Sequence, residues 1–160
     1  MMSVRQCFFI IFAIIFNSAY AVPNTPSTAI IEANQTAAKQ LKVENCWIRL
    51  MPKNLPSAGY LSIQNIGNKP VTLNEIHVPG FGMTMMHETL WKGTASSMVM
   101  LNSLTIAAKE TVLFTPGGRH FMLEKLIGNF KLDDKIPADL KMSDSSELRI
   151  LCKVKNAAGA

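Results

Sequence analysis

From residue 42 onward the chain is divided into short runs of apolar and β-branched residues, and turn residues separate these runs at intervals of about ten residues. The breaks include Pro-Gly sequences at 79–80 and 116–117. No long stretch has helical periodicity, and no internal repeat is visible. This pattern predicts an all-β sandwich of eight or nine strands in one domain. The expected strands are 43–51, 58–64, 71–78, 83–90, 98–106, 111–114, 120–123, 136–142 and 148–154.

Residues 1–21 have the organisation of a cleaved signal peptide. Arg5 supplies the positive charge, residues 7–16 (CFFIIFAIIF) form an unbroken apolar run, and Ala19 and Ala21 give the small residues of a cleavage site. The run is shorter than the roughly 20 residues that span a bilayer. We therefore expect export and cleavage near Val22; an uncleaved anchor is the alternative. Cys7 lies inside the run and not at its end, which argues against a lipoprotein.

The rest of the chain divides into three parts by composition. Residues 22–41 are rich in Pro, Ser, Thr, Asn and Ala and predict a flexible arm, with a short helical piece around 29–40. Residues 42–155 form the expected β-sandwich domain, and 156–160 are a C-terminal tail. A domain of this size can bury a core without a metal ion to fold it.

The charge balance of the chain argues against a nucleic-acid partner. Without Arg5 the chain has 15 basic and 11 acidic residues, a surplus of four positive charges with no dense basic block. This surplus is too weak to indicate a nucleic-acid partner, and export makes such a partner still less fitting. We expect a monomer with no stable membrane insertion after signal cleavage.

Two cysteines remain after cleavage, Cys46 near the start of the domain and Cys152 near its end. In an exported protein a disulfide between them is expected, and closing a loop of about 100 residues would stabilise the fold by roughly 4 to 5 kcal/mol in the chain-entropy model. Two separate buried thiols are the alternative. The sequence has no Cys-x-x-Cys motif, which argues against a redox-active pair.

The chain has only three histidines, and two of them belong to the pattern His87-x10-Met98-x21-His120-x-Met122. Imidazole nitrogen and thioether sulfur form a soft, neutral donor set that suits Cu(I) far better than magnesium, calcium or manganese. Thioethers need no deprotonation and are not lost to disulfide formation, so such a site can work in an oxidising compartment. This spacing predicts a Cu(I) site.

Strand periodicity places these donors on common faces. Side chains at positions i and i+2 share a face, so His120 and Met122 project together. For the same reason Met83, Met85 and His87 share a face, with Met86 on the other side, and Met98 pairs with Met100. The short connection 91–97 allows the segments that hold His87 and Met98 to form a hairpin, with both residues at one rim.

Packing is the competing explanation for most methionines, because methionine fills irregular cores. We interpret Met51 and Met100 in this way. Met83 and Met85 are assigned to the core or to the rim of the site. His77 has no sulfur neighbour two residues away and is expected at the surface or in a hydrogen bond.

The segments AGYLSIQNIG (58–67), MMHET (85–89) and PGGRHFML (116–123), together with Met98, resemble the periplasmic copper chaperone family PCu(A)C. The family pattern H(M)-x10-M-x21-H-x-M matches without a gap, and the resemblance covers roughly 42–155. It implies a cupredoxin-like Greek-key β-sandwich with an exposed Cu(I) site. The implied ligands are His87, Met98, His120 and Met122, with Met86 the alternative at the first position.

The resemblance also implies a function. Family members are periplasmic and deliver Cu(I) for assembly of the CuA centre of cytochrome c oxidase, often beside Sco-type thiol proteins. Some members have a His- and Met-rich C-terminal extension that holds Cu(II). This chain ends in KVKNAAGA and has no such ligands. The cysteine pair is not part of the family motif.

Other functions are weighed against copper delivery. A blue-copper carrier needs a cysteine ligand beside two histidines, which neither Cys46 nor Cys152 offers in sequence. A hydrolase needs a nucleophile motif such as Gly-x-Ser-x-Gly, and the sequence contains none. We therefore expect that the protein is not an enzyme. Copper sequestration or homeostasis in the periplasm, and a metal-free sandwich that binds another protein, stay open as alternatives.

Overall fold

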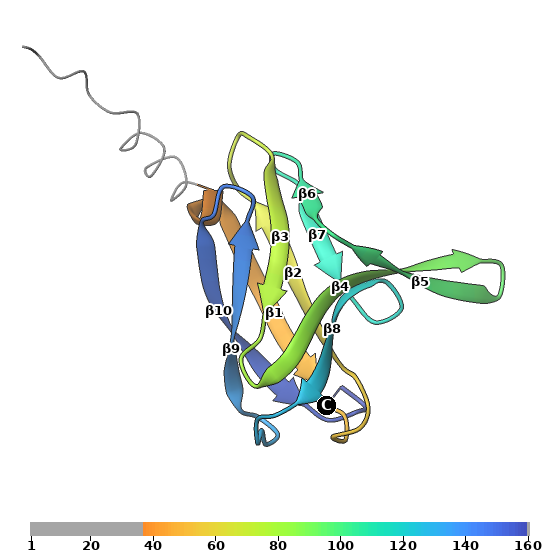
Figure 1. Cartoon of the computed structure of the whole chain (residues 1–160). Coiled ribbons are helices and arrows are strands. Elements are labelled where there is room, and N and C mark those ends of the chain that lie inside the picture. Colours follow the sequence, from red (N-terminus) through yellow and green to blue (C-terminus); the bar gives the residue numbers. More distant parts are fainter. Residues whose placement is uncertain (1–36, 160) are drawn as a thin grey trace, which may run out of the picture.

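The computed structural model describes residues 37–159, and the regular secondary structure of this part of the chain is almost all strand. A single helical turn at 37–39 precedes them (Figure 1). The strands are β1 (Leu41–Arg49), β2 (Ser57–Asn65), β3 (Val71–His77), β4 (Phe81–Lys92), β5 (Ala95–Leu101), β6 (Leu104–Ile106), β7 (Thr111–Phe114), β8 (Arg119–Leu126), β9 (Lys135–Met142) and β10 (Glu147–Lys155).

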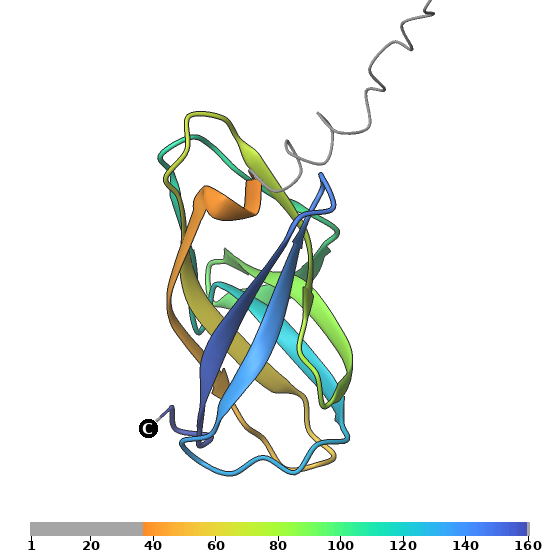
Figure 2. The same ribbon diagram turned by 90° about the vertical axis from the view of Figure 1, so that its left-hand side faces the viewer.

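The ten strands form one continuous hydrogen-bonded ladder in the order β5-β4-β8-β7-β2-β1-β10-β9-β3-β6. Pairs β1–β10 and β7–β8 are parallel, and the other pairs are antiparallel. The ladder curls on itself, so that β9, β10 and β3 lie across from β4 and β8 (Figures 1 and 2). The expected all-β sandwich is confirmed.

The core lies between these two layers because inward-facing positions alternate along the strands. In β9 every second residue from Ile136 to Met142 is buried. Across the core, Phe114 and Phe121 are fully buried, and their rings meet edge to face with centroids 6.3 Å apart. Phe121 belongs to β8, so the packing of the core fixes a strand that also takes part in the site described below.

One expected strand is divided in two. The run 98–106 becomes β5, which pairs with β4, and β6, which pairs with β3. These partners are far apart in the ladder, so the chain must cross from one edge to the other after Leu101. The polar pair Asn102-Ser103 occupies this crossing. Elsewhere the expected strands differ from the observed ones mainly at their ends.

The expected signal peptide 1–21, and the arm 22–41 up to residue 36, lie outside the described residues. Of the helical piece expected around 29–40, only residues 37–40 belong to the described part of the chain, and 37–39 are helical. Within 37–159 there is no helix long and apolar enough to cross a membrane.

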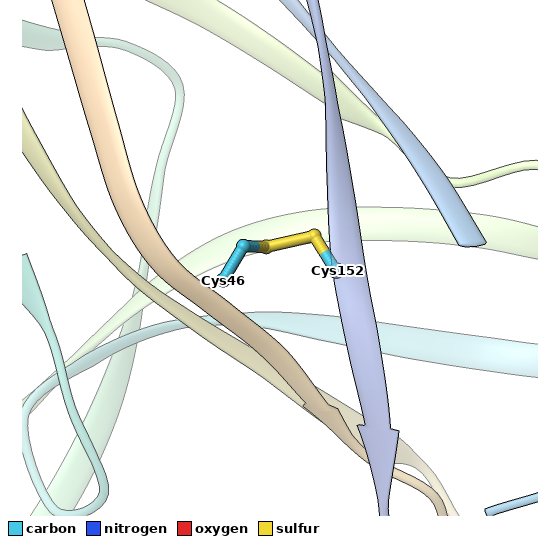
Figure 3. Close-up of a disulfide and its surroundings, with 2 residues drawn as sticks. All are labelled: Cys46 and Cys152. Carbon is cyan, nitrogen blue, oxygen red and sulfur yellow. A yellow bond between two sulfur atoms is a disulfide. The ribbon is translucent and has the colours of Figure 1, made fainter. Parts of the chain in front are cut away.

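Cys46 and Cys152 form a disulfide between the neighbouring strands β1 and β10 (Figure 3). Their Cα atoms lie 4.5 Å apart, and the bridge closes a loop with a sequence separation of 106. Asn45 has a positive φ of 55°, and the pairing of β1 with β2 shifts register between Glu44 and Trp47. This bulge contains Cys46, so the local irregularity of β1 occurs where the disulfide joins the first strand to the last.

We expect the double variant Cys46→Ala, Cys152→Ala to fold but to lose about 4 kcal/mol of unfolding free energy, because the unfolded chain is no longer constrained across this long loop. Urea unfolding followed by circular dichroism measures the difference. A reducing agent should lower the stability of the parent and leave the variant unchanged. Equal urea midpoints for parent and variant under oxidising conditions would contradict the expectation.

Candidate metal centre

Strand β4 positions the candidate site because it pairs with β8 on one side and with β5 on the other. The β4–β5 pair forms a hairpin from Met86–Leu101 to Lys92–Ala95, and its far end projects from the body of the sandwich (Figure 1). Gly93 takes a positive φ of 62° in the turn, a conformation that glycine adopts without strain. The expected hairpin between the segments of His87 and Met98 is confirmed.

The register brings the two histidines together. His87 in β4 lies directly opposite His120 in β8, and the ring centroids are 5.8 Å apart at an interplanar angle of 79°. Two residues earlier in β4, Met85 lies opposite Met122. Side chains of directly opposed residues share a face of the sheet. The imidazoles and the thioether of Met122 are therefore neighbours.

Met98 reaches the same place from β5, although its opposite residue in β4 is Thr89 and not His87. A surface cavity of about 270 Å³ is lined by Met98, His120 and Met122. The structure thus brings three of the four predicted ligands to one cavity. The ring contact with His120 places the fourth, His87, beside it.

The tautomer of His120 is fixed by a backbone carbonyl. Its Nδ1 lies 3.0 Å from the oxygen of Gly118, which can only accept a hydrogen bond, so Nδ1 bears the proton. Nε2 then presents its lone pair. A hydrogen bond of this kind orients an imidazole and raises its basicity as a metal ligand.

The loop that holds this carbonyl is itself fixed to the hairpin. The Trp91 indole donates to the oxygen of Gly117 at 2.9 Å, and the backbone N–H of Thr89 donates to the oxygen of Gly118 at 3.3 Å. Gly117 has a positive φ of 76°. The turn after Pro116 therefore joins the two sides of the site: it orients His120 and contacts the hairpin that carries Met98.

His87 differs from His120 because its Nδ1 makes no hydrogen bond and its ring has a lowered pKa. It is partly buried, and its Nδ1 is a buried atom without a hydrogen-bond partner. Burial lowers the pKa of His87 below its usual value, and the neighbouring His120 lowers it further, while Glu124 acts in the opposite direction. The ring is therefore neutral at neutral pH. A neutral imidazole with an unpaired nitrogen is a ready metal ligand.

The cavity that holds Met98, His120 and Met122 is also lined by a charged and an aromatic residue. Arg49 lies over the ring of Tyr60, 5.5 Å from its centroid, and both line the same cavity as His120. Burial raises the pKa of Tyr60, although Arg49 opposes the shift. The phenol stays neutral, so Arg49 is the charged side chain in this cavity wall.

Two predictions about methionines are corrected. Met86 is 4% exposed, lies opposite the core residue Phe121 and faces the interior, so it is not an alternative to His87 at the first position. Met100 is 60% exposed and lies opposite His87, so its interpretation as a packing residue is wrong. The i, i+2 spacing from Met98 was the signal that placed Met100 on this face.

The remaining candidates lie near the site or away from it. Met85 is partly buried and Met83 is 39% exposed, both on the β4 face that presents His87, which places them at the rim. Met51 is partly buried. His77 is exposed at the end of β3, opposite Asp139 of β9 and away from the site. It is at the surface, as expected.

The donor set decides what the arrangement can bind. Residues 37–159 contain no group of three or more His, Cys, Asp and Glu side chains that could hold a metal ion. The cluster instead combines two imidazoles with thioethers, a combination suited to soft, electron-rich ions. The fold and the cluster together define a β-sandwich protein with an imidazole–thioether centre at its surface.

The chain belongs to the family described as "Putative lipoprotein LpqE-like", whose model matches residues 41–154. Solved PCuAC domains share its fold, and the resemblance to the PCu(A)C family is thereby confirmed. No curated protein matches the chain.

Three solved structures illustrate the similarity. The Cu(I) form of DR1885 from Deinococcus radiodurans is 26% identical, with a TM-score of 0.60, over 78% of this chain and 85% of that one. The copper-bound PCuAC domain of PmoF2 is 17% identical, with a TM-score of 0.62, over 73% and 93%. The apo PCuAC domain of PmoF1 is 22% identical, with a TM-score of 0.59, over 73% and 94%.

We expect neutral His120 in the metal-free protein to be the Nδ1–H tautomer, because the Gly118 carbonyl accepts its proton. Long-range ¹H–¹⁵N NMR correlation of the imidazoles at a pH where the ring is neutral measures this directly. The exposed His77 is the internal reference. An Nε2–H pattern for His120 would contradict the assignment and remove the proposed orientation of its lone pair.

Proposed function

We propose that the protein binds Cu(I) through His87, Met98, His120 and Met122 and delivers it to another protein. The observation behind this proposal is the direct opposition of His87 and His120, with Met98 and Met122 lining the cavity at His120. The copper-bound state of two similar structures, DR1885 and the PmoF2 domain, supports the choice of metal.

The chemistry of the site favours a singly charged soft ion. All four donors are neutral, and Cu(I) accepts imidazole and thioether ligands readily. Arg49 lines the same cavity, and a positive side chain repels a doubly charged ion more strongly than a singly charged one. Cys46 and Cys152 are joined in the disulfide and do not compete as thiolate ligands.

Release follows from the position of the ligands. Met98 is 61% exposed on the projecting hairpin, whereas His87 and His120 are partly buried against the body of the sandwich. An approaching thiolate can therefore replace the thioether of Met98 first and the other donors afterwards. Each exchange forms one Cu–S bond as one Cu–ligand bond breaks, and the metal stays Cu(I). The higher affinity of thiolates sets the direction of transfer.

The partner and the compartment follow from the same chemistry. We propose as acceptor the reduced CuA domain of cytochrome c oxidase or a Sco-type thiol protein, both of which offer thiolates. We place the protein in the periplasm as a non-enzymatic monomer, exported with residues 1–21 removed. A mature N-terminus at Val22 is the signature of this processing.

The double variant His120→Ala, Met122→Ala is expected to lose tight Cu(I) binding and to remain folded. Loss of two direct ligands should weaken the affinity by more than about 100-fold, the upper range for removal of an outer-shell partner alone. Anaerobic Cu(I) titration against a competing chelator measures the affinity, and circular dichroism checks the fold.

The matched control for this titration is His77→Ala, which removes an exposed histidine of β3 away from the site. It should bind Cu(I) as the parent does. If the double variant retained parental affinity, the ligand assignment would be wrong. If the parent itself bound no Cu(I), a metal-free interaction module would be the better description.

Copper should move from the loaded protein to a reduced CuA domain when the two are mixed without oxygen. Separating the proteins and measuring the copper content of each gives the extent of transfer. A CuA domain with its cysteines replaced by serine should take up little copper, because the thiolates are missing. Retention of copper by the loaded protein in the presence of the intact domain would indicate sequestration instead of delivery.

A further inference from the structure

The cavity of the candidate metal centre carries a positive charge that no acidic residue in its wall balances. Arg49 lines this cavity, and none of the other lining residues is an aspartate or a glutamate. The other two arginines of residues 37–159, Arg119 and Arg149, each form an ion pair with a carboxylate. Arg49 forms no ion pair within this part of the chain.

The guanidinium of Arg49 is partly withdrawn from water. The residue is partly buried, and its Nε is a buried atom without a hydrogen-bond partner among the described residues. Its Cζ lies 5.5 Å from the centroid of the Tyr60 ring, a neutral phenol that does not balance the charge. A buried donor without an acceptor is costly, and the cost is greater when the group is charged. An anion beside Arg49 would lower this cost.

The register of three strands places Arg49 on the face that carries the metal ligands. Arg49 of β1 lies opposite Ala58 of β2, and Ala58 lies opposite Met122 of β8. Directly opposed residues share a face of the sheet, so only the small side chain of Ala58 separates Arg49 from Met122. A guanidinium has donors and no acceptor, and it cannot ligate the metal itself. It can only bind a group that lies beside the metal.

We propose that this cavity is also a carboxylate site, in which Arg49 binds one carboxylate group next to Cu(I). The inference rests on the proposed function. The planar fork of arginine matches a carboxylate with two parallel hydrogen bonds. Carboxylate oxygen is a hard donor, so it leaves Cu(I) to the imidazoles and thioethers. Its negative charge reduces the repulsion between Arg49 and the metal ion, and the carboxylate and Cu(I) should therefore strengthen each other's binding.

The carboxylate can come from two sources. One is a small free anion, and the other is an acidic side chain of the copper acceptor. Met98, the exposed ligand that an incoming thiolate replaces first, lines the same cavity as Arg49. An acidic side chain of the acceptor, bound at Arg49, would hold the acceptor's thiolates close to Met98.

The first test is an anaerobic Cu(I) titration in sodium acetate and in sodium perchlorate at equal ionic strength, against a chelator calibrated in both. The parent should bind Cu(I) about fivefold or more tightly in acetate, the low end of the usual coupling between two sites. The variant Arg49→Gln should bind equally in both salts, because it has no charge to attract the anion. Arg49→Lys keeps the charge without the planar fork and should show a smaller difference than the parent.

The matched control is Arg149→Gln, which removes an arginine of β10 that does not line the cavity. It should respond to acetate as the parent does, and circular dichroism checks the fold of each variant. A second readout needs no variant and no metal. Acetate should shift the NMR signal of the Arg49 Nε–H in the metal-free parent and leave that of Arg149, which is paired with Asp139, in place.

The outcomes separate this inference from the proposed function. If the parent bound Cu(I) equally in both salts and the Arg49 signal did not move, the carboxylate site would be wrong and the copper site would stand. A response to acetate that persisted in Arg49→Gln would also overturn the assignment to Arg49. A parent that bound no Cu(I) in either salt would refute the proposed function itself.

Copper transfer to a reduced CuA domain distinguishes the two sources of the carboxylate. If the acceptor supplies it, amide replacement of the acidic residues nearest the acceptor's cysteines should slow transfer from the parent and not from Arg49→Gln. Such a double-mutant comparison isolates the contact between the two groups. If a free anion supplies the carboxylate, these replacements should affect both donors equally. Both results keep the carboxylate site at Arg49.

Discussion

The pairing of β4 with β8 is the constraint on which the site depends. A slip of one residue would turn the histidine of one strand toward the core, because successive side chains of a strand alternate between faces. The core side of the pair prevents this slip: Met86 lies opposite Phe121, and Glu88 forms an ion pair of 2.9 Å with Arg119. Gly59 in β2 adds to the constraint, since a Cβ there would overlap the Phe121 ring. The buried face thus determines what the exposed face presents.

Much of the fold could be predicted because its signals are local. Runs of alternating residues and Pro-Gly breaks mark most of the strands, and these signals depend only on neighbours in sequence. The division of 98–106 into β5 and β6 depends instead on which distant strand each half pairs with, β4 or β3. Such a choice is made by tertiary packing. The sequence alone could not determine it.

For the candidate site, the sequence could predict which side chains share a face of a strand but not which of them are buried. The i, i+2 rule placed His120 with Met122 and separated Met86 from His87, and the register agrees with both statements. The rule says which face a side chain occupies but not whether another layer covers that face. Met100 is assigned to packing because methionine commonly fills cores, but its side chain is 60% exposed on β5. Burial depends on where the hairpin ends in space, and periodicity holds no information about that.

The site combines a fixed part with an exposed part, and each contributes differently to metal exchange. The imidazole of His120 is oriented by a turn whose carbonyls also accept hydrogen bonds from Thr89 and Trp91. The thioethers of Met98 and Met100 are on an exposed strand with few packing constraints. In the proposed site, the oriented imidazole of His120 limits the reorganisation needed to bind an ion, and the exposed thioether of Met98 can leave first. We therefore expect capture and stepwise release to coexist in the proposed site, because β8 holds the oriented imidazole of His120 while the exposed strand β5 holds the thioether of Met98.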